Sequence, residues 1–100
     1  MAGVTLSTHI LDTEIGEPAG GVKVSLYRGK DLISYQETDE DGRIPNLFET
    51  DFVPGEYRLV FHVDGGFFEK VELTIALIEE RHYHVPLLIS SYACASYRGS

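Results

Sequence analysis

The chain has 100 residues, 43% of them hydrophobic, and its 16 acidic and 8 basic residues give a formal net charge of −8. This length and composition suffice for one hydrophobic core, so we interpret residues 1–100 as a single domain. Because the sequence is acidic and contains no block of Lys or Arg, it lacks the electrostatic footprint of a nucleic-acid-binding protein, and no nucleic-acid partner is expected.

The sequence gives no indication of a membrane partner or of export. No stretch approaches the roughly 18 consecutive apolar residues of a spanning helix, and residues 1–7 lack the basic start and apolar segment of a signal peptide. The single cysteine, Cys94, excludes an intramolecular disulfide and suits a reducing compartment. We therefore expect a cytoplasmic protein in which Cys94 is a structural thiol.

The first half of the chain reads as short strands separated by turns. Residues 5–11 alternate with period two, which predicts a strand whose two faces differ. A loop at residues 16–21 leads to a second strand from Val22, and a hairpin at residues 28–31 leads to a third that reaches Glu37. An Asp-Gly turn at residues 39–42 precedes Arg43, and Pro45 makes residues 44–52 ambiguous. In the first strand the expected faces are Leu6, Thr8 and Ile10 on one side and Ser7, His9 and Leu11 on the other.

The second half of the chain continues this pattern. Residues 57–63 alternate as a strand with one strongly buried face, and residues 67–78 place Val71, Leu73, Ile75 and Leu77 on a common face. A turn at residues 79–81 leads into a strand that carries His82. Because no segment has a helical period over three turns, the sequence predicts an all-β protein, an antiparallel β-sandwich of two sheets with about seven to eight strands.

Histidines are the main candidates for chemistry. His82 and His84 are one residue apart on an extended run, so both side chains should lie on one face. Such a pair can supply two metal ligands, but the spacing gives no third ligand, and we expect no metal. His9, His62 and Arg43 are further candidates, although His62 fits an ordinary half-exposed strand position. No phosphate-binding loop, nucleophile elbow or paired-carboxylate signature is present.

Four segments taken together resemble the transthyretin-related 5-hydroxyisourate hydrolases. They are residues 6–13 with 16–22, residues 38–43, residues 82–88 with the sequence His-Tyr-His-Val-Pro-Leu-Leu, and the terminal Tyr97-Arg98-Gly99-Ser100. The two outer segments are specific, because a terminal Tyr-Arg-Gly-Ser behind His-Tyr-His-Val-Pro separates these hydrolases from transthyretin itself.

The resemblance implies a prealbumin-like subunit in a homotetramer, a dimer of dimers whose active sites lie in a channel where two dimers meet. It implies hydrolysis of a ring amide of 5-hydroxyisourate, without a cofactor, to 2-oxo-4-hydroxy-4-carboxy-5-ureidoimidazoline in urate degradation. One histidine, His9 or His84, would be the general base, and Arg43 would hold the planar substrate. The catalytic residues implied are His9, Arg43 and His84, and the substrate-binding residues are Tyr97, Ser100, His82 and Arg98.

The chain also departs from this family. Only residues 64–66 stand where family members have a longer segment with a short helix, so we expect that helix to be missing. Residues 93–95 and Ser91 also differ from the usual pattern. The alternative functions are a non-catalytic transthyretin-like ligand-binding or interaction module, and a structural sandwich domain. A carrier has no need of two histidines and an arginine together, which favours the hydrolase.

Overall fold

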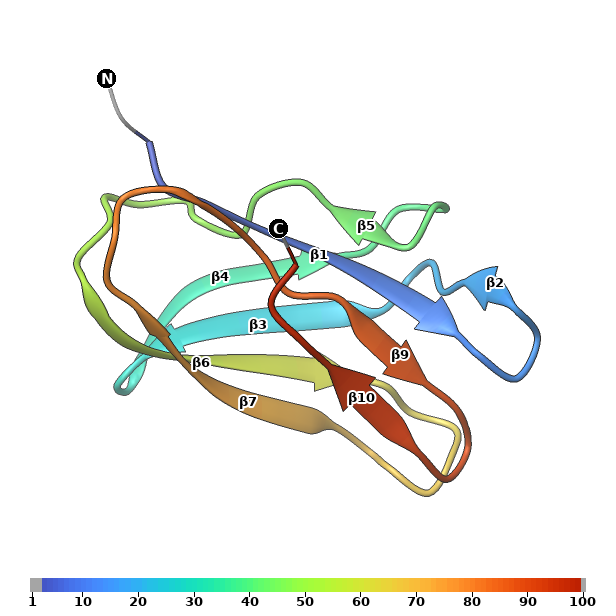
Figure 1. Ribbon diagram of the computed structural model, residues 1–100. Coiled ribbons are helices and arrows are strands. Elements are labelled where there is room, and N and C mark those ends of the chain that lie inside the picture. Colours follow the sequence, from blue (N-terminus) through green and yellow to red (C-terminus); the bar gives the residue numbers. More distant parts are fainter. Residues whose placement is uncertain (1–2, 100) are drawn as a thin grey trace.

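Two β-sheets pack face to face in the computed structural model, which describes residues 3–99 (Figure 1). One sheet has the order β10-β9-β1-β2, with β5 and β8 also paired to β1, and the other has the order β4-β3-β6-β7. The strands are β1 (Thr5–Asp12), β2 (Glu17–Pro18), β3 (Lys23–Arg28), β4 (Asp31–Glu37), β5 (Arg43–Ile44), β6 (Gly55–His62), β7 (Val71–Leu77), β8 (His82–His84), β9 (Leu87–Ile89) and β10 (Cys94–Ser96).

The all-β fold class predicted from the sequence is confirmed. Residues 3–99 contain no helix, so the short helix expected to be missing is indeed absent from this part of the chain. It follows that no helix in the described residues is long and apolar enough to cross a membrane. Residues 44–52, which were ambiguous in the sequence, are irregular after Ile44, because Pro45 has no N–H to donate to a ladder.

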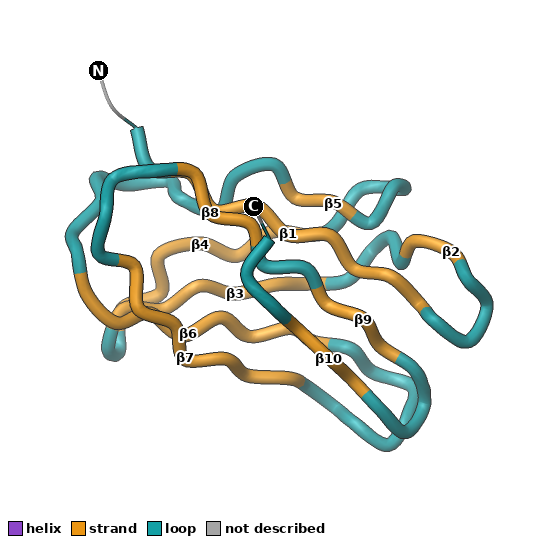
Figure 2. Tube along the Cα trace, in the orientation of Figure 1, coloured by secondary structure: helices purple, strands orange, loops and turns teal. Residues whose placement is uncertain are grey.

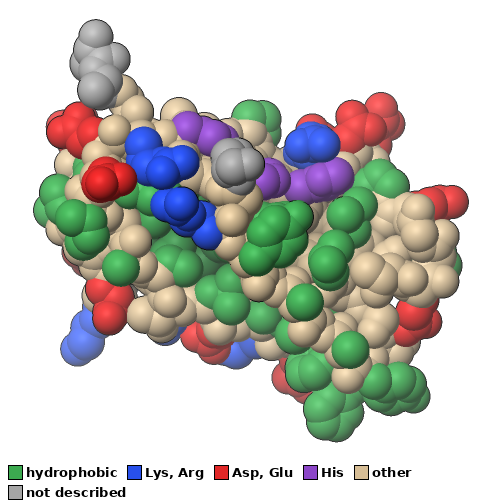
Figure 3. All heavy atoms as spheres, viewed as in Figure 1, with side chains coloured by type: hydrophobic (Ala, Val, Ile, Leu, Met, Phe, Trp, Pro, Cys, Tyr) green, Lys and Arg blue, Asp and Glu red, His purple; other side chains and the backbone are tan. Residues whose placement is uncertain are grey.

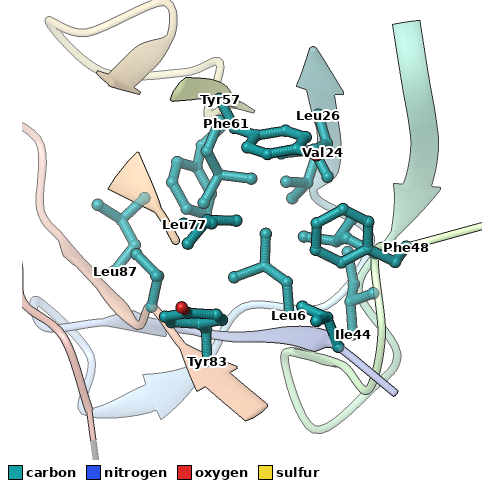
Figure 4. Packing of buried hydrophobic residues seen from close by; sticks show 14 of the residues in the cluster. Leu6, Val24, Leu26, Ile44, Phe48, Tyr57, Phe61, Leu77, Tyr83 and Leu87 are labelled. Carbon is teal, nitrogen blue, oxygen red and sulfur yellow. The ribbon is translucent and has the colours of Figure 1, made fainter. Parts of the chain in front are cut away.

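The core lies between the sheets and follows the predicted alternation. In β1 the side chains of Leu6, Thr8 and Ile10 are buried, whereas Ser7 and His9 are half-buried on the opposite face. Figure 4 shows side chains of the two sheets facing one another across the core. The labelled residues from the six-stranded sheet are Leu6, Ile44, Tyr83 and Leu87, and those from the four-stranded sheet are Val24, Leu26, Tyr57, Phe61 and Leu77.

β1 pairs in parallel with β8 and β9, a detail that the prediction of an antiparallel sandwich did not include. Ser7 stands opposite His84 and Ile10 opposite Leu87, so both pairings share one register. The interruption between β8 and β9 falls at Pro86, which lacks the N–H that a ladder requires. The pairing is parallel because the chain passes through the whole four-stranded sheet before it returns beside β1.

The Asp-Gly turn predicted at residues 39–42 seats β5 against β1. Gly42 has φ 75°, and a Cβ there would lie 2.5 Å from the carbonyl oxygen of Ile10. The amide of Ile10 donates to the Gly42 carbonyl at 2.7 Å, and the Asp39 carboxylate accepts from the amide of Arg43 at 3.0 Å. Only glycine fits this conformation and this close approach. The turn therefore fixes Arg43 beside β1.

Candidate active site

Three strands present polar side chains on the outer face of the six-stranded sheet. β1 contributes Ser7 and His9, β8 contributes His82 and His84, and β5 contributes Arg43. Their sequence neighbours point into the core, because successive strand residues alternate between faces. Figure 2 shows β8 and β5 on either side of β1. In Figure 3 histidine side chains gather on this surface next to Lys and Arg side chains.

His9 and Arg43 are direct neighbours across the antiparallel β1–β5 pair. Residues directly opposite in such a pair have Cβ atoms about 4.5–5.5 Å apart on the same face. His9 is half-buried and Arg43 is exposed. Within residues 3–99 no ion pair involves the Arg43 guanidinium. Its planar, permanently charged group is therefore free to bind an anionic or carbonyl oxygen.

His84 is held from two sides. On one side, Ser7 is its register partner in β1, and the Ser7 hydroxyl oxygen lies 2.7 Å from His84 Nδ1. On the other side, the amide of Gly99 donates to the His84 carbonyl at 2.7 Å. A Cβ on Gly99 would lie 2.7 Å from Cδ2 of the His84 ring, so the tail packs directly on the imidazole. These contacts fix the ring position.

His82 belongs to the same hydrogen-bonded group. Its Nε2 lies 3.2 Å from the Ser7 hydroxyl oxygen, and its Nδ1 is hydrogen-bonded to the hydroxyl of Thr5. Both ring nitrogens of this exposed histidine thus have protein partners. The role in substrate binding that the resemblance implied for His82 stays a prediction.

The surroundings of His84 favour its neutral form. Burial lowers the pKa of His84, and the positive charges of His82, Arg43 and His9 lower it further. These contributions also indicate that the residues around His84 lie within electrostatic range of one another. A histidine whose pKa lies below the usual value of about 6.5 is unprotonated at neutral pH. The imidazole of His84 can therefore accept a proton.

The remaining predicted residues are Tyr97, Arg98, Ser100 and His62, and the structure describes all of them except Ser100. Tyr97 is 60% exposed, and Tyr97 and Arg98 border a groove of about 600 Å³ along β7. Ser100 lies outside the described residues. His62 lies on the other sheet, where its Nε2 is 3.1 Å from the hydroxyl oxygen of Ser25, as expected for a histidine apart from the site. Ser7 is the residue that sequence reasoning missed, although its position on the face of His9 was predicted.

The histidine face lies outside the two hollows described in residues 3–99, and His82 and Arg43 on it are exposed. The two hollows described in residues 3–99 are the groove along β7 and one of about 350 Å³ near Glu14 and Asp64, and neither is lined by His9 or His84. No group of three or more His, Cys, Asp or Glu side chains in the described residues is placed to hold a metal ion. The chemistry available here comes from imidazoles, hydroxyls and a guanidinium.

The chain is similar in sequence to proteins of a known family. A family model described as the HIUase/Transthyretin family matches residues 6–99. A 5-hydroxyisourate hydrolase 2 of Rhizobium meliloti is 40% identical over 114 aligned positions, covering 95% of each chain. The alignment is longer than this 100-residue chain, so the relative has a segment that is missing here.

Solved structures show the same similarity. The structure of Klebsiella pneumoniae 5-hydroxyisourate hydrolase superposes with a TM-score of 0.90 at 33% identity, covering 97% of this chain and 99% of the other. Sea bream transthyretin in complex with thyroxine superposes with a TM-score of 0.83 at 32% identity, covering 95% and 94%. An enzyme and a hormone-bound protein thus share this fold.

The pKa of His84 can be tested directly by NMR titration of the imidazole signals. His84 should take up its proton below the ordinary histidine pKa of about 6.5. Arg43→Ala should raise this pKa, because it removes a positive charge that disfavours the imidazolium. Arg28→Ala, which removes the same charge from β3 of the other sheet, is the control and should leave it unchanged.

The lowered pKa of His84 also makes the free energy of unfolding depend on pH. Because the pKa is lower in the folded state, the unfolded state binds more protons between the two pKa values. The contribution of His84 to the free energy of unfolding is therefore complete above the pKa that His84 has in the unfolded chain, and it is lost as the pH falls to the pKa that His84 has in the folded protein.

In the NMR titration, an unchanged or lowered His84 pKa in Arg43→Ala would contradict the arrangement of charges described above.

Proposed function

The chain belongs to the HIUase/Transthyretin family, and we propose that it hydrolyses 5-hydroxyisourate in urate degradation. The observation that supports this most is the meeting of His9, Arg43 and His84 on one sheet face from three separate strands. A hydrolase needs a neutral base and a group that stabilises developing negative charge, and this face offers both. A thyroxine carrier needs neither.

In the proposed mechanism His84 is the general base. Its lowered pKa keeps the imidazole neutral, and the contacts with Ser7 and Gly99 hold the ring in place. His84 takes a proton from water, and the hydroxide oxygen bonds to the ring carbonyl carbon. Arg43 stabilises the negative charge on the carbonyl oxygen. The ring C–N bond then breaks, the remaining hydroxyl proton passes to the leaving nitrogen, and a carboxylate forms.

The C-terminal tail supports a role in binding substrate. Ser96 pairs with Leu87 and Gly99 with His84 in one antiparallel register, so the tail continues β10 toward the site. Tyr97 stands two residues before Gly99, a spacing that in a strand brings side chains to the same face. We propose that the Tyr97 phenol contacts substrate there. Arg98 and Ser100 are proposed as further binding residues on the family resemblance alone.

A non-catalytic carrier is the second candidate function, favoured by the similarity to thyroxine-bound sea bream transthyretin. The deciding experiment follows the absorbance of freshly generated 5-hydroxyisourate with and without the protein. A hydrolase accelerates the decay in proportion to protein concentration. Decay at the uncatalysed rate would refute the enzyme and leave the carrier.

Single substitutions should identify the catalytic group. His9→Ala, Arg43→Ala and His84→Ala should each lower kcat by about a hundredfold or more, because each removes a proton-transfer or charge-stabilising group. Each of the three side chains is exposed or half-buried, so the thermal unfolding curve should change little. His62→Ala, on the other sheet, is the matched control and should keep the full rate. An equal loss in His62→Ala would refute the assignment.

A tight glycine next to His84 gives a sharper test of the tail. Gly99→Ala should lower kcat at least about tenfold, because the new Cβ displaces a ring that must be positioned closely. Gly66→Ala is the matched control, since its Cβ would meet the Ser91 carbonyl oxygen at 3.1 Å, in a loop away from the histidines. Equal rates for Gly99→Ala and the wild type would remove the tail from the site.

We propose a homotetramer, a dimer of dimers, in the cytoplasm. Two edges support assembly: β7 and β10 each end a sheet, and exposed Ile78 and Tyr97 lie beside them. The free thiol of exposed Cys94 supports a reducing compartment. Closed symmetric assembly would also cover the open histidine face.

Light scattering of the wild type should give four times the subunit mass of 11.2 kDa. His9→Ala should give the same mass, because the substitution removes a catalytic group and leaves both sheet edges intact. An active monomer at assay concentration would contradict an active site completed by assembly.

A further inference from the structure

Ser7 occupies a position that the proposed reaction has not used. Its hydroxyl oxygen lies between two imidazoles, 2.7 Å from His84 Nδ1 and 3.2 Å from His82 Nε2. The other ring nitrogen of His82, Nδ1, is hydrogen-bonded to the hydroxyl of Thr5. The four groups therefore form one continuous chain, from half-buried His84 through Ser7 and exposed His82 to Thr5. The adjacent β1 and β8 strands hold this chain in register (Figure 2).

The proposed role of His84 as the base selects the direction of this chain of hydrogen bonds. A serine hydroxyl has one hydrogen to donate and two lone pairs that can accept. If Ser7 donated to His84 Nδ1, the proton of neutral His84 would sit on Nε2, which could not act as a base. If Ser7 donates to His82 Nε2 instead, His84 Nδ1–H donates to Ser7 and Nε2 keeps its lone pair. Of the two directions that link the imidazoles, only the second suits a general base. The Tyr83 carbonyl, the other acceptor near the Ser7 hydroxyl, is farther away at 3.5 Å.

We propose that Ser7 is a positioning residue that holds His84 as its Nδ1–H tautomer and relays the proton of His84 to His82. The inference rests on the proposed function, in which His84 is the base. It adds a role for two residues, Ser7 and His82, that direct contact with substrate does not require.

The relay balances the proposed hydrolysis. Water loses a proton to His84 Nε2, and its hydroxide bonds to the substrate carbonyl carbon. The Nδ1 proton of His84 moves to the Ser7 oxygen as the hydroxyl proton of Ser7 moves to His82 Nε2. His82 then releases its Nδ1 proton by way of the Thr5 hydroxyl to solvent. The hydroxyl proton that stays on the intermediate goes to the leaving nitrogen. After the product leaves, His84 releases its Nε2 proton to solvent, and a proton returns through Thr5, His82 and Ser7 to His84 Nδ1, which restores the starting tautomers. Each turnover therefore releases one proton to the solvent.

The chain contains a matched control for this arrangement. Ser25 in β3 makes a similar contact, with its hydroxyl oxygen 3.1 Å from Nε2 of His62. Its hydrogen bonds in the described residues reach one imidazole, whereas those of Ser7 reach two. Ser25→Ala therefore removes a serine–histidine hydrogen bond without touching the proposed relay.

The first experiment reads the tautomer without any substrate. The ¹⁵N chemical shifts of the imidazoles, measured in the intact protein above the histidine pKa, distinguish the Nδ1–H and Nε2–H forms. His84 should be the Nδ1–H form in the wild type and should shift toward the Nε2–H form in Ser7→Ala. Ser25→Ala should leave His84 unchanged. An Nε2–H form of His84 in the wild type, or an Nδ1–H form that persists in Ser7→Ala, would overturn the proposal.

The second experiment measures 5-hydroxyisourate hydrolysis. Ser7→Ala should lower kcat about tenfold to a hundredfold with KM changed less than about twofold, because the relay acts on proton transfer. Ser7→Thr keeps the hydroxyl and should restore most of the rate, and Ser25→Ala should keep it. Adding His82→Ala to Ser7→Ala should lower kcat no further, since both changes break one relay, whereas loss of a substrate contact of His82 would raise KM. If the losses of kcat from the two single substitutions multiplied in the double variant, or if Ser7→Ala kept the wild-type kcat, the relay would be overturned.

The two experiments separate the inference from the proposed function. A wild-type protein that does not accelerate the decay of 5-hydroxyisourate would refute the hydrolase, and the relay with it. The ¹⁵N measurement would still decide whether Ser7 sets the His84 tautomer. Thermal unfolding of Ser7→Ala checks that the variant is folded, and a folded variant with the expected tautomer change and full activity would refute the relay alone.

Discussion

The register of β1 against its neighbours is the constraint on which the rest of the site depends. β1 pairs with β5 on one side and with β8 and β9 on the other. A slip of one residue would turn His9 into the core and Leu6 and Ile10 out to solvent, because strand side chains alternate. Burial of those apolar residues therefore holds the polar face in place. Thr8 adds to this, because its buried hydroxyl donates to the Val85 carbonyl at 2.6 Å.

The same packing that defines the site also places like charges together. His84 is partly buried among His82, His9 and Arg43, all of which disfavour its protonated form. At neutral pH this costs little, since a neutral imidazole carries no charge to repel. At lower pH His84 must become protonated beside these positive charges, so folding loses stability. A base kept ready for proton transfer and a fold that weakens in acid have one electrostatic cause.

Alternation in the sequence predicted which face each strand residue occupies, but it could not predict which strands are neighbours. The faces of His9 and the His82–His84 pair were correct for this reason. The parallel pairing of β1 with β8 depends on contacts about 77 residues apart along the chain, which no local pattern contains. Residues 39–42 were recognised as a turn and Arg43 as a candidate residue, yet its assignment to one site with His9 and His84 came only through the family resemblance. Its place beside His9 requires Gly42 to sit against Ile10.

Ser7 and Gly99 show a different limit, because neither residue type is unusual in a strand or a tail. A serine on an outward face is ordinary until another strand brings two imidazoles to its hydroxyl. A glycine near a terminus is ordinary until its missing side chain leaves room for a histidine ring. Both residues act through what they allow His84 to do. Positioning groups of this kind are set by tertiary contacts, so the structure is needed to recognise them.

An open sheet face has consequences for catalysis as well as for assembly. Water next to an exposed guanidinium screens its field, so the stabilisation that we propose Arg43 gives to a developing oxyanion would be smaller than in a closed site. Covering the face with another subunit would remove that water and strengthen each interaction with the reacting atoms. His82, at the exposed end of the Ser7 hydrogen bonds, would then need a path to solvent along the rim. Assembly and proton release therefore act on the same few residues, and the geometry of the interface must satisfy both.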